Sequence, residues 1–152
     1  MPKVLVIADT SCLVILDKIH ELQILHKVYT YVITTPEVQL EFGKPLPDWI
    51  KIESVNDKRY QRFLETQLDL GESSAIALAS EKTDCILILD DLKARKVARR
   101  LGFKYTGTLG VINKAKEEGI IKRIRPYIDK LKSTDFRISE KVIEDLLKRN
   151  NE

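Results

Sequence analysis

Cysteine and histidine are scarce in this chain of 152 residues, and their scarcity excludes several kinds of site. The two cysteines, Cys12 and Cys85, have no second cysteine nearby, so they cannot form a zinc ribbon. Each lies in an apolar run, which favours a buried free thiol and a reducing cytosol. The two histidines, His20 and His26, lack the spacing of a metal motif and are interpreted as ordinary helix residues.

Long apolar segments are also missing. No apolar run approaches the roughly 20 residues that a membrane helix needs. The first residues, MPKVLVIADTS, contain no long apolar stretch and no cleavage site of small residues, so no signal peptide is evident. We therefore expect a soluble, cytoplasmic protein. Without a linker or an internal repeat, residues 1–152 are expected to form a single domain.

The glycines do not form a phosphate-binding motif. The chain has six glycines but neither a P-loop nor a GxGxxG pattern after its first apolar run. Haloacid-dehalogenase phosphatases use a second aspartate two residues after the first, but here Asp9 is followed at that position by Ser11. No pairing of serine with histidine is persuasive. These absences argue against nucleotide-binding, phosphatase and serine-hydrolase chemistry.

The composition is that of a globular protein. Apolar residues make up 43% of the chain and charged residues 32%, enough for both a core and a hydrated surface. The net charge of +3 neither requires nor excludes a nucleic acid, so local patches must decide.

Short apolar runs alternate with helical patterns along the chain. Buried strands are predicted at 3–8 and 85–89. A further strand, aromatic and β-branched, is predicted at 29–34, an edge strand at 49–55 and a short strand at 103–105. Helical spacing fills the intervals, with Thr35-Pro36, Gly102 and Ser139 as boundary signals. This order predicts a three-layer α/β/α domain with a central, mostly parallel sheet and a helical tail from about 126 to 152.

Acidic residues follow the predicted strands. In open parallel sheets, ligands bind beyond the carboxyl ends of the strands. The acids at or near those ends are Asp9, Glu41, Glu72, Asp90 and Asp91. A group of carboxylates without histidine or cysteine suits Mg²⁺ or Mn²⁺, which can activate water for phosphodiester hydrolysis.

Each acid also has a purely structural interpretation. Asp9 or the Asp90-Asp91 pair can cap a helix, Glu41 can be a solvated helix residue, and Glu72 can complement a helix dipole. Only their joint placement makes a site.

Basic residues gather in two places. Lys93, Arg95, Lys96, Arg99 and Arg100 lie on the helix predicted after Asp91, and a second cluster comprises Lys122, Arg123 and Arg125. Either cluster can bind a phosphate backbone or simply form a solvated helix face.

At these residues the sequence resembles the PIN-domain family, the PilT N-terminus-like nucleases that include the VapC-type ribonuclease toxins. The matching segments are VIADTSCLVIL, TTPEVQLEF, LDLGESSAIALA and LILDDLKARKVARRLG. One subgroup of the family is similar to this chain in two further segments. These are YTGTLGVINKAKEEGII and the helical C-terminal tail FRISEKVIEDLLKRN.

The resemblance implies a Mg²⁺- or Mn²⁺-dependent ribonuclease that is often a homodimer. The family's four acids fall on Asp9, Glu41, Glu72 and the Asp90-Asp91 pair, with Asp91 preferred as the ligand. Glu72 stands where the family usually has aspartate. Thr10 or Ser11 would hydrogen-bond a ligand or a metal-bound water, as would Thr108. Lys93, Arg95, Lys96 and Arg99 would bind RNA.

Other functions stay open at this point. A toxin would have a small antitoxin protein as its partner. A non-catalytic module that binds RNA or protein would use the acids as caps and the basic helix for binding. A phosphoacceptor receiver domain fits less well, because no later strand ends in a well-placed lysine.

Overall fold

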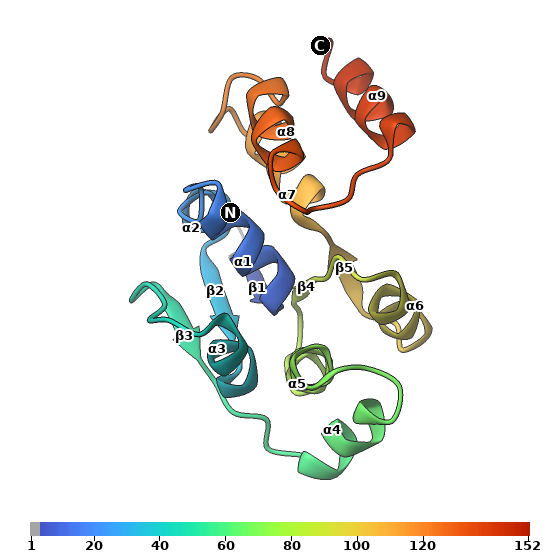
Figure 1. Cartoon of the computed structure of the whole chain (residues 1–152). Helices are drawn as coiled ribbons and strands as arrows, with labels where there is room; N and C mark the ends of the chain where they lie inside the picture. The colour runs from blue at the N-terminus through green and yellow to red at the C-terminus, as the bar shows by residue number, and fades with distance from the viewer. Residues whose placement is uncertain (1–3) are drawn as a thin grey trace.

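The fold is built on one parallel sheet in a computed structural model that describes residues 4–152. The strands are β1 (Leu5–Ala8), β2 (Tyr31–Thr34), β3 (Ile50–Ile52), β4 (Ile86–Ile88) and β5 (Lys104–Thr106). Their order across the sheet is β3-β2-β1-β4-β5, and every pair of neighbours is parallel (Figure 1). In register, Val6 of β1 lies between Val32 of β2 and Ile86 of β4.

Helices connect the strands and continue beyond them. Their bounds are α1 (Thr10–Lys18), α2 (Ile24–Val28), α3 (Pro36–Phe42), α4 (Lys58–Glu65), α5 (Leu70–Ser80), α6 (Leu92–Arg100), α7 (Thr108–Glu117), α8 (Arg125–Lys132) and α9 (Glu140–Arg149).

Alternating side chains of the strands separate two cores. Val6, Ala8 and Ile88 pack on one face with residues of α1, α2 and α7. Ile7 and Leu87 pack on the other face with residues of α5 and α6. Because both faces of the sheet are covered at its centre, the strands β1 and β4 are apolar throughout. The predicted three-layer α/β/α fold is therefore confirmed.

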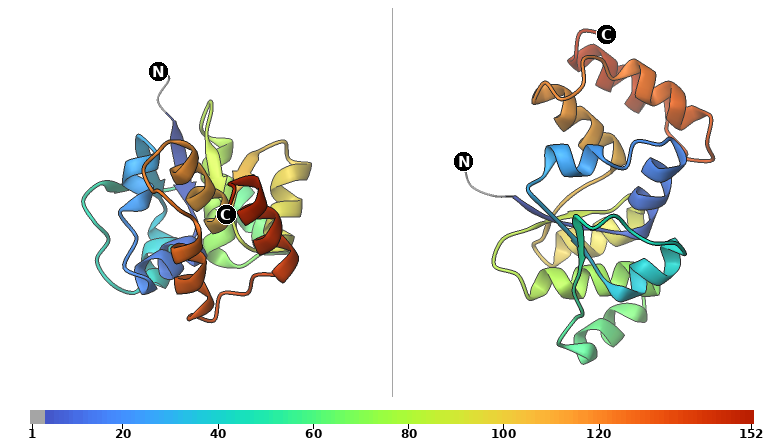
Figure 2. Two further views of the ribbon diagram at one scale, coloured as in Figure 1. Left: turned by 90° about the horizontal axis from the view of Figure 1, so that it is seen from above. Right: turned by 90° about the vertical axis from the view of Figure 1, so that its left-hand side faces the viewer.

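The helical tail lies on the α1 side of the sheet. In Figure 2, α8 and α9 form a further tier beyond α1 and α2, and α4 and α5 lie on the opposite side of the sheet. Ile128 and Leu131 of α8, with Ile143 and Leu146 of α9, are buried in the core on the α1 side. Apolar burial thus attaches the tail to the rest of the chain.

Several helix boundaries follow local chemistry. Thr35 caps α3 by accepting a hydrogen bond from the amide of Val38, and Gly43 ends α3 in the left-handed conformation. Ser139 caps α9 in the same way, by accepting from the amide of Val142. The strand predicted from residue 29 begins at Tyr31, because Tyr29 ends α2 and is buried there.

The order of the strands produces one change of direction. From β1 the chain moves outward to β2 and β3, and it then returns to the other side of β1 to form β4 and β5. The crevice between β1 and β4, at their carboxyl ends, is where ligands bind in such sheets. Among residues 4–152, no helix has the length and apolar character to cross a membrane.

Candidate functional site

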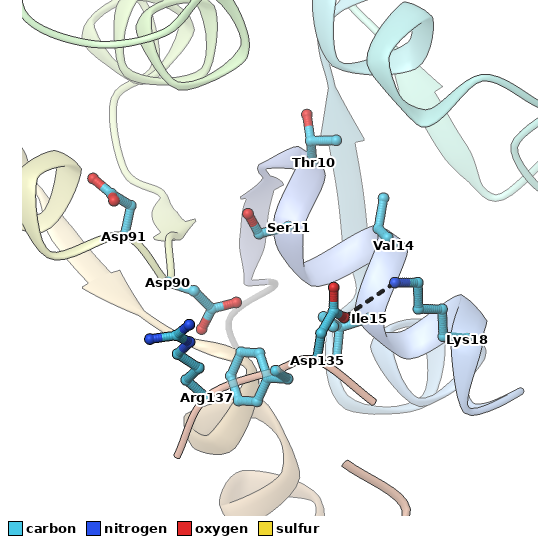
Figure 3. Close-up of a pocket in the computed structure, with 10 residues that line it drawn as sticks. Thr10, Ser11, Val14, Ile15, Lys18, Asp90, Asp91, Asp135 and Arg137 are labelled. Atoms are coloured by element: carbon cyan, nitrogen blue, oxygen red, sulfur yellow. Dashed lines mark hydrogen bonds and ion pairs between the residues drawn. The ribbon is translucent and has the colours of Figure 1, made fainter. Parts of the chain in front are cut away.

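The carboxyl ends of β1 and β4 bring the predicted acids to one region. Asp9 follows β1, and Asp90 and Asp91 follow β4. Glu41 lies on α3, and Glu72 in the first turn of α5. A pocket of about 430 Å³ opens beside these strand ends (Figure 3); its lining residues include Thr10, Ser11, Asp90 and Asp91.

Asp9 is the buried member of this group, with 3% of its surface exposed. It stands at the N-cap of α1, yet its side chain makes no capping hydrogen bond. The Oδ1 atom is buried and has no hydrogen-bond partner among the described residues. The capping interpretation therefore does not explain this side chain.

The pKa of Asp9 is raised from its ordinary 3.8 to about 8. Burial is the largest cause, and a hydrogen bond to the backbone of Thr10 opposes it. Further increases come from the negative charges of Glu72, Asp69 and Glu41. A nearby cation would reverse this effect, because it favours the charged carboxylate.

Glu41 is held against the start of α1. The hydroxyl of Thr10 donates to Oε1 of Glu41 at 2.5 Å. Gly71 of α5 allows this approach, since a Cβ atom there would lie 2.1 Å from that oxygen and 3.0 Å from the Thr10 hydroxyl. Glu41 is exposed, but this contact shows that it is not merely a solvated helix residue.

Glu72 takes part in a capping box at the start of α5. Its backbone amide donates to the Asp69 side chain at 2.8 Å, and its own carboxylate accepts from the Asp69 amide at 3.4 Å. The pKa of Glu72 is raised from 4.5 to about 7, first by burial and then by the charges of Asp69 and Asp91. Glu72 therefore belongs both to the capping box of α5 and to the group of acids.

The two aspartates after β4 have different surroundings. Asp90 accepts hydrogen bonds from the amide and the hydroxyl of Thr108, at 2.8 and 2.6 Å. Asp91 caps α6 by accepting from the amide of Ala94 at 2.9 Å, and its charge acts on Glu72. Asp91 thus contributes to the raised pKa of Glu72, whereas Thr108 fixes the orientation of Asp90.

The predicted RNA-binding residues divide into two kinds. Arg95 donates to the carbonyl of Leu89 at 2.7 Å and lies over the ring of Tyr105, and Arg99 donates to the Tyr105 hydroxyl. Lys93 and Lys96 are exposed on α6. Arg95 and Arg99 therefore already have hydrogen-bond partners within the protein, whereas Lys93 and Lys96 extend into solvent.

Two arginines of the second basic cluster have a structural task. Arg123 forms an ion pair with Glu152 at 3.6 Å, and Arg125 donates to the Glu152 carbonyl. These two arginines hold the end of the tail.

The acids fit a hard divalent cation by their chemistry. Oxygen is the only donor type, and the unpartnered buried Oδ1 of Asp9 is the kind of atom that such an ion satisfies. As they lie, no three of the Asp, Glu, His or Cys side chains described form a group close enough to hold an ion. Mg²⁺ usually keeps several waters and takes only one or two carboxylates directly, so this arrangement is compatible with it.

Sequence reasoning missed three residues of this region. Asp69 is a further carboxylate beside Asp9 and Glu72, and the pattern Asp69-x-x-Glu72 was a recognisable capping-box signal. Asp135 and Arg137, from the segment between α8 and α9, line the same pocket as Asp90. No local pattern in the sequence points to them, because tertiary packing alone brings the tail there.

A comparison with family models gives one match. The family DUF3368, described as a PIN domain, matches residues 5–152 of the chain. No curated protein matches it at a significant level.

Proposed function

Because this chain belongs to the PIN-domain family, whose members are generally nucleases, we propose that it is a divalent-metal-dependent endoribonuclease. The observation that carries the proposal is Asp9, whose buried Oδ1 atom has no partner among the described residues. Its pKa of about 8 means that burial and the surrounding acids disfavour its charged form when no cation is present. A carboxyl group in such surroundings is a strong candidate for a functional site.

The residues that would hold Mg²⁺ or Mn²⁺ are Asp9, Glu41, Glu72 and Asp91, with Asp90 beside them. When bound, such an ion would lower the pKa of a water molecule and polarise the scissile phosphate. The protein supplies the orientation of these side chains. The Thr10 hydroxyl holds Glu41, and the Thr108 amide and hydroxyl hold Asp90.

The exposed lysines of α6 would bind the RNA backbone. Lys93 and Lys96 lie on the helix that Asp91 caps, so positive charge stands next to the acids. Such charges attract phosphates without selecting a base sequence. Arg95 and Arg99 would add to this field from their positions on Tyr105.

The substitution Asp9→Asn tests the proposal. It keeps the side-chain volume and removes the charge, so we expect folding to persist while RNA cleavage and Mn²⁺ binding are lost. Circular dichroism would check the fold, calorimetry would measure Mn²⁺ binding, and a labelled RNA would report cleavage. Asp145→Asn, at an exposed position of α9, is the matched control. Cleavage by Asp9→Asn at the wild-type rate would refute the assignment.

A non-catalytic RNA-binding module is the second candidate, and one observation favours it. Asp69, Asp90 and Asp91 all accept hydrogen bonds from backbone amides at the starts of helices, as structural caps do. The same calorimetric titration separates the two candidates, because a module that uses its acids only as caps would not bind Mn²⁺. The toxin role, an antitoxin partner and a homodimer remain predictions from the family resemblance.

A further inference from the structure

The segment between α8 and α9 reaches the acidic site from the tail. Asp135, Phe136 and Arg137 line the pocket that also contains Thr10 and Asp90 (Figure 3). The pocket therefore has one wall from the sheet and α1 and another from the tail. The inference drawn below about this second wall rests on the function proposed above.

Arg137 is a cation without a protein partner in this pocket. Its side chain is exposed, and no hydrogen bond or ion pair joins it to any other residue within 4–152. The other cation of the pocket, Lys18, is paired with Asp135 at 3.2 Å. The Arg137 guanidinium thus remains available beside the acids, and its planar group suits two-pronged binding of a phosphate.

A second hollow is lined by the same segment. Asp90, Arg95 and Arg137 line it together with apolar side chains, namely Leu92, Leu109, Phe136, Ile138 and Val142. Leu92 is 73% exposed and Val142 is 47% exposed, so much of this apolar surface faces solvent. Asp90, Phe136 and Arg137 line both hollows, so the two hollows adjoin at this segment.

An aromatic and apolar hollow beside an unpaired arginine suits one class of ligand. Unpaired bases stack on aromatic and apolar surfaces, while the adjoining phosphates bind cations. Inside a duplex, the flat faces of each base are covered by the neighbouring base pairs and cannot stack on a protein surface. The combination therefore favours single-stranded RNA over double-stranded RNA.

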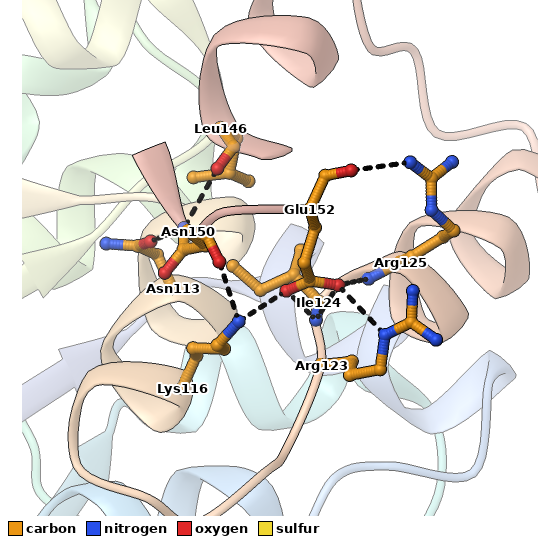
Figure 4. A network of polar contacts seen from close by, with 8 residues as sticks. All are labelled: Asn113, Lys116, Arg123, Ile124, Arg125, Leu146, Asn150 and Glu152. Carbon is orange, nitrogen blue, oxygen red and sulfur yellow. Dashed lines mark hydrogen bonds and ion pairs between the residues drawn. The ribbon is translucent and has the colours of Figure 1, made fainter. Parts of the chain in front are cut away.

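We propose that the segment 133–139 is the second wall of a groove for single-stranded RNA, in which Arg137 binds a backbone phosphate and the apolar hollow receives a base. The segment is anchored for this task. Lys18 pairs with Asp135, and Ser139 caps α9. Glu152 ties the end of the tail to Lys116 and to the start of α8 (Figure 4).

The test measures RNA binding separately from cleavage. An Asp9→Asn background without divalent metal prevents hydrolysis, and fluorescence anisotropy of a labelled single-stranded RNA reports affinity. In that background, Arg137→Gln should weaken binding about ten-fold, the loss typical of one charge-assisted hydrogen bond. The slope of log affinity against log salt should fall by about 0.7, which corresponds to one phosphate contact on a single strand.

Two variants serve as comparisons. Lys141→Gln removes the same charge from an exposed position of α9 outside both hollows, and it should leave affinity and slope unchanged. Arg137→Lys keeps the charge and should restore most of the salt slope. Because the Arg137 side chain is exposed and unpaired, none of these changes should affect folding.

The outcomes separate this inference from the proposed function. RNA binding that Arg137→Gln does not weaken would overturn the role of Arg137 while leaving the nuclease proposal in place. Equal losses in Arg137→Gln and Lys141→Gln would also overturn it, since they would show only an effect of net charge. Failure of the Asp9→Asn background and of the wild-type chain to bind or cleave any RNA would overturn both proposals.

Discussion

Asp9 combines two properties that rarely occur together in one side chain. It is an acid buried almost completely, and its Oδ1 atom has no hydrogen-bond partner among the described residues. Burial without a partner costs free energy, and for a carboxyl group the protein reduces that cost by keeping the proton. The sheet places Asp9 here because β1 ends one residue earlier, at its central position in the strand order.

The raised pKa of Asp9 makes stability depend on pH in a defined direction. Because the folded-state pKa of about 8 lies above the ordinary 3.8, the stabilising contribution is complete at low pH and is lost as pH rises through about 8. An asparagine side chain at this position would mimic the neutral acid at every pH. We therefore expect Asp9→Asn, in EDTA, to gain melting temperature relative to wild type between about pH 5 and about pH 8, by about 4 °C or more.

Thermal unfolding of both proteins across this pH range measures the effect. Asp145→Asn should follow the wild-type curve, since Asp145 is exposed. Parallel curves for wild type and Asp9→Asn would contradict the raised pKa. Adding Mn²⁺ should stabilise the wild type more than the variant, because an ion that binds only the folded state raises its stability.

At the scale of elements, the close approach of α5 to α3 shapes the site. Gly71 stands where these helices meet, and a side chain there would occupy the space of the Glu41 carboxylate. The first turn of α5 also carries Glu72, so one helix start sets the positions of two acids.

Gly71→Ala should therefore impair activity more than stability. The added Cβ would meet the flexible end of Glu41, which can turn away, so the helix should persist while the carboxylate is displaced. We expect cleavage to fall at least about ten-fold, as a misplacement of about 1 Å can cause. A cleavage assay combined with thermal unfolding measures both effects.

A double substitution identifies the cause. If Gly71→Ala acts through Glu41, then Glu41→Ala and the combination Gly71→Ala with Glu41→Ala should have equal activity. A further loss in the combined variant would show that Gly71 matters for another reason.

At the scale of the whole molecule, Glu152 fastens the tail to the body of the protein. Its side chain is 4% exposed and contacts Lys116 at 2.7 Å and the amide of Ile124 at 2.8 Å (Figure 4). Burial raises the pKa of Glu152, but the hydrogen bonds from Ile124, Lys116 and Arg125 outweigh it, and the pKa falls to about 2. This contribution to stability is present above the ordinary pKa of 4.5 and is lost as pH falls through about 2.

Glu152→Gln should loosen α8 and α9. Loss of the buried charge removes the only carboxylate that pairs with the Lys116 ammonium among the described residues and leaves it the Asn150 carbonyl, which should cost about 1–3 kcal/mol of stability. Hydrogen exchange should become faster in the two tail helices and stay unchanged in the strands. Glu140→Gln is the control, since Glu140 is exposed and its ion pair with Lys132 spans 3.9 Å. Equal exchange in both variants would contradict the role of Glu152.

The sequence by itself determined the fold class and the identity of the candidate acids. Parallel strands buried on both faces leave a clear pattern of short apolar runs, because side chains of both faces, such as Val6 and Ile7 or Leu87 and Ile88, are removed from water. The helix boundaries at Thr35 and Ser139 are equally predictable, since capping depends on a few neighbouring residues.

Only the tertiary structure decided what surrounds each acid. Whether the Oδ1 atom of Asp9 has a partner, and which hydroxyls hold Glu41 and Asp90, depends on contacts between segments far apart in the chain. The same is true of Arg137, whose exposed side chain has no periodicity to mark it and reaches the pocket through the packing of the tail. Local sequence patterns encode local structure, whereas burial, pKa and the composition of a pocket arise from distant residues that meet only in the folded chain.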